Sequence, residues 1–134
     1  AAPTPLDAAG RCDCSGFLSW AWGEPRRDSA DGEDEMPGEW LWTDGLYVDA
    51  RSTQRFVREI AAPHVQVGDA LVYRGHVPGQ RVGHCALVIA RPAIVHRFAD
   101  VTVIGCHSGQ PPAITRASGR LWEGRAGIAV RRVA

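Results

Sequence analysis

The sequence predicts an α+β domain with a largely antiparallel sheet, and two observations support this prediction. Helix-like apolar spacing is confined to the first part of the chain, within residues 14–61. From residue 68 onward, short runs rich in β-branched residues alternate with turns that contain Gly and Pro. We therefore expect N-terminal helices packed on a mostly antiparallel sheet of about five strands.

Two helices are expected ahead of most of the strands. The first covers residues 14–22, an apolar run that Gly23 ends. The second covers roughly residues 53–61, because Ser52 can cap its N-terminus and apolar side chains then share one face. Between the two, residues 24–39 are charged and interrupted by Pro and Gly, which is typical of a surface loop.

The sheet is predicted from β-rich runs in the second half of the chain. These runs are residues 70–73, 84–90, 101–107, 113–115 and 128–133. The segment between the first two runs is rich in turn-forming residues, and no internal repeat is present. Strands joined in this order indicate an antiparallel meander.

Length and composition are those of a single globular domain covering residues 1–134. Hydrophobic residues make up 45% of the chain and charged residues 22%. The 15 basic and 15 acidic residues balance, so the whole chain has no basic footprint for nucleic acid. No stretch approaches the ~20 apolar residues of a membrane-spanning helix. We expect neither a nucleic-acid partner nor a membrane span.

The chain has four cysteines, at positions 12, 14, 85 and 106. Cys12 and Cys14 are too close in sequence for an easy bridge to each other. Cys85 and Cys106 both lie in predicted strands, on the side that would face the core. The sequence leaves open whether these two form a disulfide or remain buried thiols.

Cys14 stands at the start of the first predicted helix. A helix N-terminus carries about half a positive charge and unpaired N–H groups, which favour the thiolate form of a nearby cysteine. His84 opens a predicted strand and supplies an imidazole that can act as a base. A thiolate close to an imidazole indicates nucleophilic attack on an acyl group.

Three segments carry a resemblance to a known family: DCSGF at residues 13–17, VGDALVY at 67–73 and VGHCALV at 82–88. In this order they resemble the NlpC family of papain-like cysteine peptidases, which cut the peptide stems of the bacterial cell wall. The resemblance implies a papain-like fold, with Cys14 as the nucleophile and His84 as its base. It also implies linkages that contain D-amino acids, and no metal or organic cofactor.

In that family a third polar residue, often a histidine on the strand after the base, orients the imidazole. His107 ends the predicted strand at residues 101–107, where a site can form. His96 matches the family's commoner short spacing from the base, but its segment looks like the tip of a hairpin. We therefore predict His107 as the third residue, with His96 as the alternative.

The predicted substrate-binding residues are Asp13, Ser15, Trp40 and Trp42. In the family, the acidic residue before the cysteine lies beside the bound peptide, so Asp13 is expected to hold its amino end. Trp40 and Trp42 would share one face of a strand and stack on the sugars of a glycan strand. The implied partners are peptidoglycan stem peptides, which in turn implies an exported protein, periplasmic or extracellular. We expect it to be a monomer.

Two other interpretations fit parts of the pattern. Cys12, Cys14, His84 and Cys106 could surround a zinc ion, because tetrahedral zinc sites use thiolates and imidazoles. Against this, the C-x-C spacing is tighter than that of the usual structural pair. The same cysteine and histidine could also serve an amidase or an acyltransferase, including a toxin-like effector, since one scaffold hosts many activities.

Overall fold

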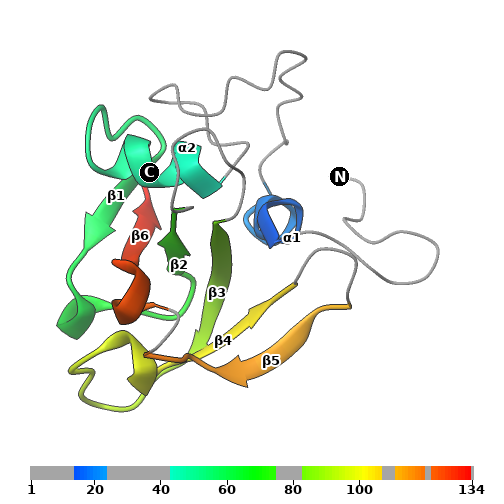
Figure 1. Ribbon diagram of the computed structural model, residues 1–134, viewed down its shortest axis with the longest axis vertical. Coiled ribbons are helices and arrows are strands. Elements are labelled where there is room, and N and C mark those ends of the chain that lie inside the picture. The colour runs from blue at the N-terminus through cyan, green and yellow to red at the C-terminus, as the bar shows by residue number, and fades with distance from the viewer. Residues whose placement is uncertain (1–13, 24–42, 75–82, 107–110, 120–121, 134) are drawn as a thin grey trace.

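The computed structural model describes residues 14–23, 43–74, 83–106, 111–119 and 122–133 of the chain. These residues form one six-stranded sheet in the order β1-β6-β2-β3-β4-β5, and every neighbouring pair is antiparallel (Figure 1). The strands are β1 Val57–Ile60, β2 Ala70–Tyr73, β3 His84–Ala90, β4 Thr102–Gly105, β5 Ala113–Arg116 and β6 Ile128–Arg132. Strands β1 and β5 are therefore the two edges of the sheet.

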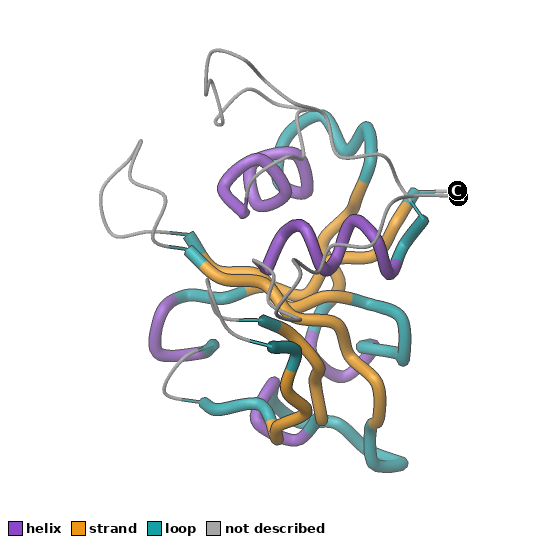
Figure 2. The backbone as a smooth tube through the Cα atoms, turned by 90° about the vertical axis from the view of Figure 1, so that its right-hand side faces the viewer, coloured by secondary structure: helices purple, strands orange, loops and turns teal. Residues whose placement is uncertain are grey.

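Two short α-helices cover one face of this sheet (Figure 2). They are α1, Cys14–Ala21, and α2, Thr43–Ala50, each eight residues long. Helix α1 packs against β3 and β4, whereas α2 packs against β1, β2 and β6. Three single 3₁₀ turns complete the described structure: η1 Ala62–His64, η2 Phe98–Asp100 and η3 Glu123–Arg125. Within the described ranges, no helix has both the length and the apolar character that crossing a membrane requires.

The expected papain-like α+β fold is wrong. The described chain is mostly a six-stranded antiparallel sheet, and its α-helical content is limited to two eight-residue segments. The second predicted helix, at residues 53–61, does not form, because Val57 to Ile60 pair with β6 as the edge strand β1. In β1 only Val57 and Ile60 are buried, so a strand has produced the three-residue apolar spacing that is typical of a helix.

A buried carboxylate directs the chain from α2 into β1. Asp49 is fully buried, and its two oxygens accept hydrogen bonds of 2.9–3.0 Å from three successive backbone N–H groups, those of Arg55, Phe56 and Val57. Ser52 does not cap a following helix, because its hydroxyl donates backward to the carbonyl of Val48 at 2.6 Å. Side-chain hydrogen bonds to the backbone have here replaced the predicted helix.

The other elements agree more closely with their predictions. Strands β2 and β3 have the predicted bounds, residues 70–73 and 84–90. Helix α1 begins at Cys14 and ends at Ala21, immediately before the turn that contains Gly23. Strands β4, β5 and β6 fall within about two residues of their predicted ranges, which is the usual uncertainty of an element's ends.

Buried side chains form a cluster on each face of the sheet. The helix-side cluster, beneath α1 and α2, consists of Leu18, Leu46, Ala50, Val57, Ala70, Val72, Cys85, Ile128 and Val130. The far-side cluster consists of Ile60, Val65, Leu71, Tyr73, Ala86, Val88, Val95, Val101, Val103, Ala117, Trp122 and Ala129. Strand β3 contributes to both clusters, because successive side chains of a strand point to opposite faces.

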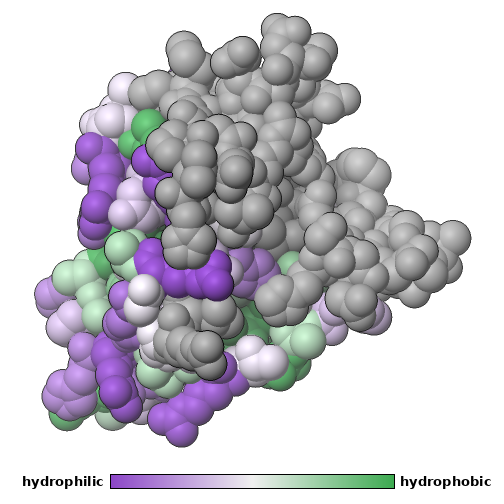
Figure 3. Space-filling model, in the orientation of Figure 1, coloured by the Kyte–Doolittle hydropathy of each residue, from purple (hydrophilic) through white to green (hydrophobic). Residues whose placement is uncertain are grey.

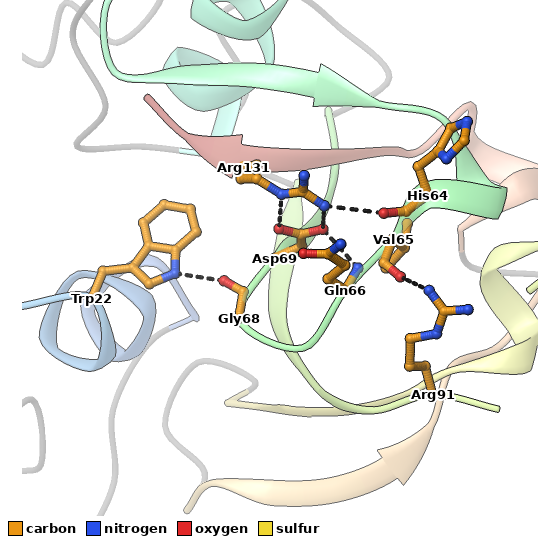
Figure 4. Close-up of polar contacts among 8 residues, drawn as sticks. All are labelled: Trp22, His64, Val65, Gln66, Gly68, Asp69, Arg91 and Arg131. Carbon is orange, nitrogen blue, oxygen red and sulfur yellow. Dashed lines mark hydrogen bonds and ion pairs between the residues drawn. The ribbon is translucent and has the colours of Figure 1, made fainter. Parts of the chain in front are cut away.

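Gly68 and Asp69, which precede β2, connect several parts of the fold (Figure 4). The Asp69 carboxylate accepts two hydrogen bonds from the guanidinium of Arg131 on β6, at 2.8 and 2.9 Å, and one from the backbone N–H of Gln66. The carbonyl of Gly68 accepts a hydrogen bond of 3.0 Å from the indole of Trp22, just beyond α1. Gly68 has a φ of 97°, a conformation that strongly favours glycine.

Asp69→Asn is expected to lower the free energy of unfolding by about 3 kcal/mol, because it leaves the Arg131 charge without its carboxylate partner. The Asp69 side chain is only 3% exposed and that of Arg131 27%. The matched control is Glu59→Gln, which removes the carboxylate of the exposed pair with Arg51 and should cost less than about 1 kcal/mol. Urea unfolding of both variants measures the difference. Equal losses would contradict a special role for the Asp69 pair.

Candidate functional site

His84 stands at the start of β3 against two aromatic rings. It lies directly opposite Tyr73 of β2, and the two ring centroids are 6.1 Å apart. Trp122 stacks on the imidazole, with centroids 5.7 Å and ring planes 27° apart, and meets Tyr73 edge-on at 5.3 Å. Trp122 and Tyr73 are both buried, so one face of the imidazole rests on a fixed surface.

Contacts around the two rings keep them in place. Trp122 donates its backbone N–H to the carbonyl of Ser118 at 2.9 Å, and its own carbonyl accepts the N–H of Gly127 at 2.6 Å. The guanidinium of Arg125 lies 5.1 Å from the centroid of the Tyr73 ring, in a cation–π arrangement. The segment that follows β5 is thereby tied to β2, with His84 beside it.

Gly83 allows β3 to begin close to β2. A Cβ atom at position 83 would lie 2.5 Å from the carbonyl oxygen of Tyr73 and 3.1 Å from the side chain of Thr43. Any side chain there would push the start of the strand away from β2 and α2. The glycine before His84 therefore has a steric reason in this fold.

A pocket of about 280 Å³ lies beside His84 on the far side of the sheet. Its walls are His84, Ala86, Val103, Gly105, Ala113, Thr115, Arg116, Ser118 and Trp122. Arg116 pairs with Thr102 of β4, and its guanidinium donates its Nε–H to the carbonyl of Ala99 at 3.2 Å. The pocket therefore extends from the imidazole of His84 along β4 and β5 to Arg116.

Helix α1 runs along β3 from the end at which His84 stands. Near the start of the helix, Phe17 packs against Cys106, which follows β4. Beyond the end of the helix, Trp22 bonds to Gly68 at the opposite end of β3, where the backbone N–H of Gly68 donates to Val88. The N-terminus of α1 and the start of β3 therefore lie at the same end of the sheet.

His84 and α1 lie on opposite faces of that sheet. The imidazole packs with Tyr73 and Trp122 of the far-side cluster, whereas Cys85 faces the helix side. Cys14 is the first residue of α1, and its side chain lies outside the described structure. His84 is the first residue of β3, so it lies at the end of that strand.

Most of the other predicted site residues fall outside the described ranges. These are Asp13, Trp40, Trp42 and His107, together with the side chain of Ser15. Their roles stay predictions. The described part of the predicted constellation is His84 and the backbone of α1 from Cys14 onward.

His96, the alternative third residue, does not lie near His84. It is exposed in the loop that follows Ala90, the last residue of β3. A seven-residue strand is about 20 Å long, and His96 lies beyond the end that is opposite His84. Strand β4 returns to the His84 end, where Gly105 packs against β3. Of the two candidates, only His107 follows that end of β4 in the sequence.

The described cysteines differ in their bonding. Cys85 is a free, buried thiol, whereas Cys106 is disulfide-bonded, so these two are not bridged to each other. A disulfide sulfur is not a thiolate, so Cys106 does not supply the ligand that the zinc interpretation requires. No group of three metal-binding side chains gathers anywhere in the described ranges. Cys12 and the side chain of Cys14 lie outside them.

The contacts of His84 with Tyr73 and Trp122 were not predicted from the sequence. Tyr73 had a usable signal, because antiparallel pairing of the predicted strands 70–73 and 84–90 brings Tyr73 opposite His84. Trp122 had none. It reaches His84 only because the chain turns back through η3 before entering β6.

Gly83→Ala is expected to lower the free energy of unfolding by about 1–3 kcal/mol, because the added methyl group overpacks the start of β3. The matched control is Gly119→Ala, whose Cβ would be 3.4 Å from the flexible carboxylate of Glu123. Urea unfolding of both variants measures the effect. A loss for Gly83→Ala no larger than that for Gly119→Ala would mean that β3 does not need a glycine there.

The chain matches no protein-family model, no curated protein and no solved structure. Three groups at one end of the sheet define its candidate chemistry. They are an imidazole stacked on Trp122, the pocket that this imidazole lines, and the N-terminus of α1.

Proposed function

We propose that this protein is a cysteine hydrolase in which Cys14 is the nucleophile and His84 is the base. The observation that supports this most is the course of α1, which starts with Cys14 at the His84 end of β3. A helix start that carries a cysteine and a strand start that carries a histidine share one end of the sheet. This is the pairing that thiol-dependent acyl transfer needs.

In the proposed reaction, the Cys14 thiol gives its proton to the His84 imidazole, and the sulfur attacks the carbonyl carbon of the substrate. Backbone N–H groups at the start of α1 stabilise the resulting oxyanion. The leaving amine takes the proton from the imidazolium, and a thioester to Cys14 is left. A water molecule deprotonated by His84 then hydrolyses the thioester and restores the thiol.

The proposal requires the sulfur and the imidazole to meet around the end of β3. The imidazole is on the far side of the sheet and α1 is on the helix side, but the sheet ends at His84. Stacking on Trp122 fixes the plane of the imidazole. We propose His107, which follows β4, as the residue that orients it.

The proposed substrate is the peptide stem of bacterial peptidoglycan, the substrate class of the family that the sequence motifs resemble. Stem peptides carry carboxylates, and Arg116 is one of the residues that line the pocket beside His84. We assign a substrate carboxylate to the guanidinium of Arg116. The proposed contacts of Asp13, Ser15, Trp40 and Trp42 with peptide and glycan complete the site, and such a substrate implies export.

The proposal also assigns the disulfide. Cys106 is disulfide-bonded and Cys85 is not, and the other two cysteines of the sequence are Cys12 and Cys14. A nucleophilic cysteine must be a thiolate. The proposed bridge is therefore Cys12–Cys106, which would tie the segment before α1 to the end of β4 and leave the Cys14 thiol free.

Cys14→Ala is expected to abolish hydrolysis of purified peptidoglycan, and His84→Ala to slow it by about 10²- to 10⁴-fold, because the nucleophile and the base are lost. The control is Cys85→Ala, which removes a buried thiol on the helix side and should retain activity. Mass spectrometry of the released fragments measures the rate and separates a cut within the stem from an amide cut at the sugar. Full hydrolysis by Cys14→Ala would refute the assignment.

Proteolysis under non-reducing conditions is expected to yield a Cys12–Cys106 linked peptide, while iodoacetamide labels Cys14 in the folded protein, since the proposal needs a free thiol there. Mass spectrometry identifies both products. Cys85 is the internal control, because a buried thiol should react only after unfolding. A Cys14–Cys106 bridge in protein that hydrolyses peptidoglycan would contradict the proposed nucleophile.

A further inference from the structure

A second pocket, of about 450 Å³, lies near the β1 edge of the sheet. Its walls are Arg58, Glu59, Ile60, Ala61, Pro63, His64, Gln66, Arg91 and Arg131, and we name it the arginine pocket after three of them. Its volume is in the usual range of sites for small ligands. In Figure 3, hydrophilic side chains lie among more apolar ones on the left-hand side of the molecule, where β1 forms the edge of the sheet.

Arg91 lines this pocket, and no carboxylate of the described residues balances its charge. Its guanidinium donates to three backbone carbonyls, those of Val65 at 2.6 Å, Pro92 at 2.9 Å and Ala93 at 2.8 Å (Figure 4 shows the first). These acceptors are neutral, so they fix the position of the guanidinium without cancelling its charge. The loop after β3 therefore presents a fixed cation to the pocket.

Arg58 and Arg131 add two further guanidinium groups to the wall. They stand directly opposite each other in the pairing of β1 with β6, and like charges in that relation repel. Arg131 is balanced by Asp69, and Figure 4 shows its third guanidinium nitrogen pointing away from that carboxylate. Within the described residues Arg58 has no ion pair, because the neighbouring Glu59 pairs with Arg51 at 2.9 Å.

The guanidinium charges of Arg58 and Arg91 thus remain unbalanced within the described residues. The neighbouring guanidinium of Arg131 is paired with Asp69 but still has N–H groups to donate. We propose that the arginine pocket binds the phosphate group of a phosphate ester. A phosphate monoester carries about −1.5 to −2 charges at neutral pH and three acceptor oxygens, whereas a single carboxylate carries one charge. Guanidinium groups bind phosphate through paired N–H donors, which suits a site built from arginines.

This site is separate from the proposed hydrolase site. Arg91 follows the last residue of β3, whereas His84 is the first, so about 20 Å of strand separates them. Loss of hydrolysis in Cys14→Ala therefore says nothing about the arginine pocket, and loss of phosphate binding says nothing about Cys14.

The test is titration calorimetry of the full chain with inorganic phosphate and with glucose 6-phosphate, alongside Arg58→Gln. Saturable binding is expected for the unchanged chain, and Arg58→Gln should weaken it about tenfold, the usual cost of one charge-assisted contact. Arg58 is exposed and unpaired among the described residues, so its loss should not alter thermal unfolding. The matched control is Arg97→Gln, which removes an exposed guanidinium that lines neither of the two pockets, and this variant should bind phosphate as the unchanged chain does.

Sedimentation with vesicles that contain phosphatidic acid distinguishes the source of the phosphate group. Tighter binding of glucose 6-phosphate than of inorganic phosphate, without vesicle binding, indicates a soluble ester. Vesicle binding that Arg58→Gln abolishes indicates a lipid headgroup instead, and either outcome supports the phosphate site. The proposal is overturned if neither phosphate compound nor the vesicles bind, or if Arg58→Gln and Arg97→Gln lose affinity equally.

Discussion

The ion pair between Asp69 and Arg131 is the constraint on which the rest of the sheet depends. It joins the start of β2 to β6, and the same carboxylate and guanidinium also hold the backbone at Gln66 and His64. The hydrogen bond to Asp69 raises the pKa of Arg131, and burial of the guanidinium opposes this. An ion pair with so buried a carboxylate is stabilising only when its geometry is good and further hydrogen bonds satisfy that carboxylate, and Asp69 also accepts the backbone N–H of Gln66.

The segment that carries this pair also sets the position of α1. Trp22 bonds to the carbonyl of Gly68, and the backbone of Gly68 and Asp69 pairs with Val88 on β3. These contacts therefore fix the position of α1 relative to β3 at the end of β3 that lies away from His84. The candidate chemistry at one end of the sheet depends on polar contacts at the other end, and the arginine pocket shares Arg131 with those contacts.

The parts of the fold that the sequence predicted correctly are those whose cause is local. Strands β2 and β3 follow from continuous apolar runs between turns, and α1 follows from an apolar run before Gly23. The second helix and the fold class were wrong because β1 mimics helical spacing and because Asp49 organises backbone several residues ahead of it. In the candidate site, His84 was predicted from the sequence as a base and this stays a prediction, but its contact with Trp122 was not predicted, since that contact depends on the return of the chain through η3.

The alternation of side chains along β3 has a chemical consequence. Tyr73 pairs with His84, and this pairing alone directs the imidazole towards Trp122 and the thiol of Cys85 towards the helices. A shift of β3 by a single residue would exchange the two, burying a basic ring under α1 and presenting sulfur to the pocket instead. The register of the backbone pairing thus determines which functional group lies on the pocket side of β3, whatever rotamer the side chain adopts.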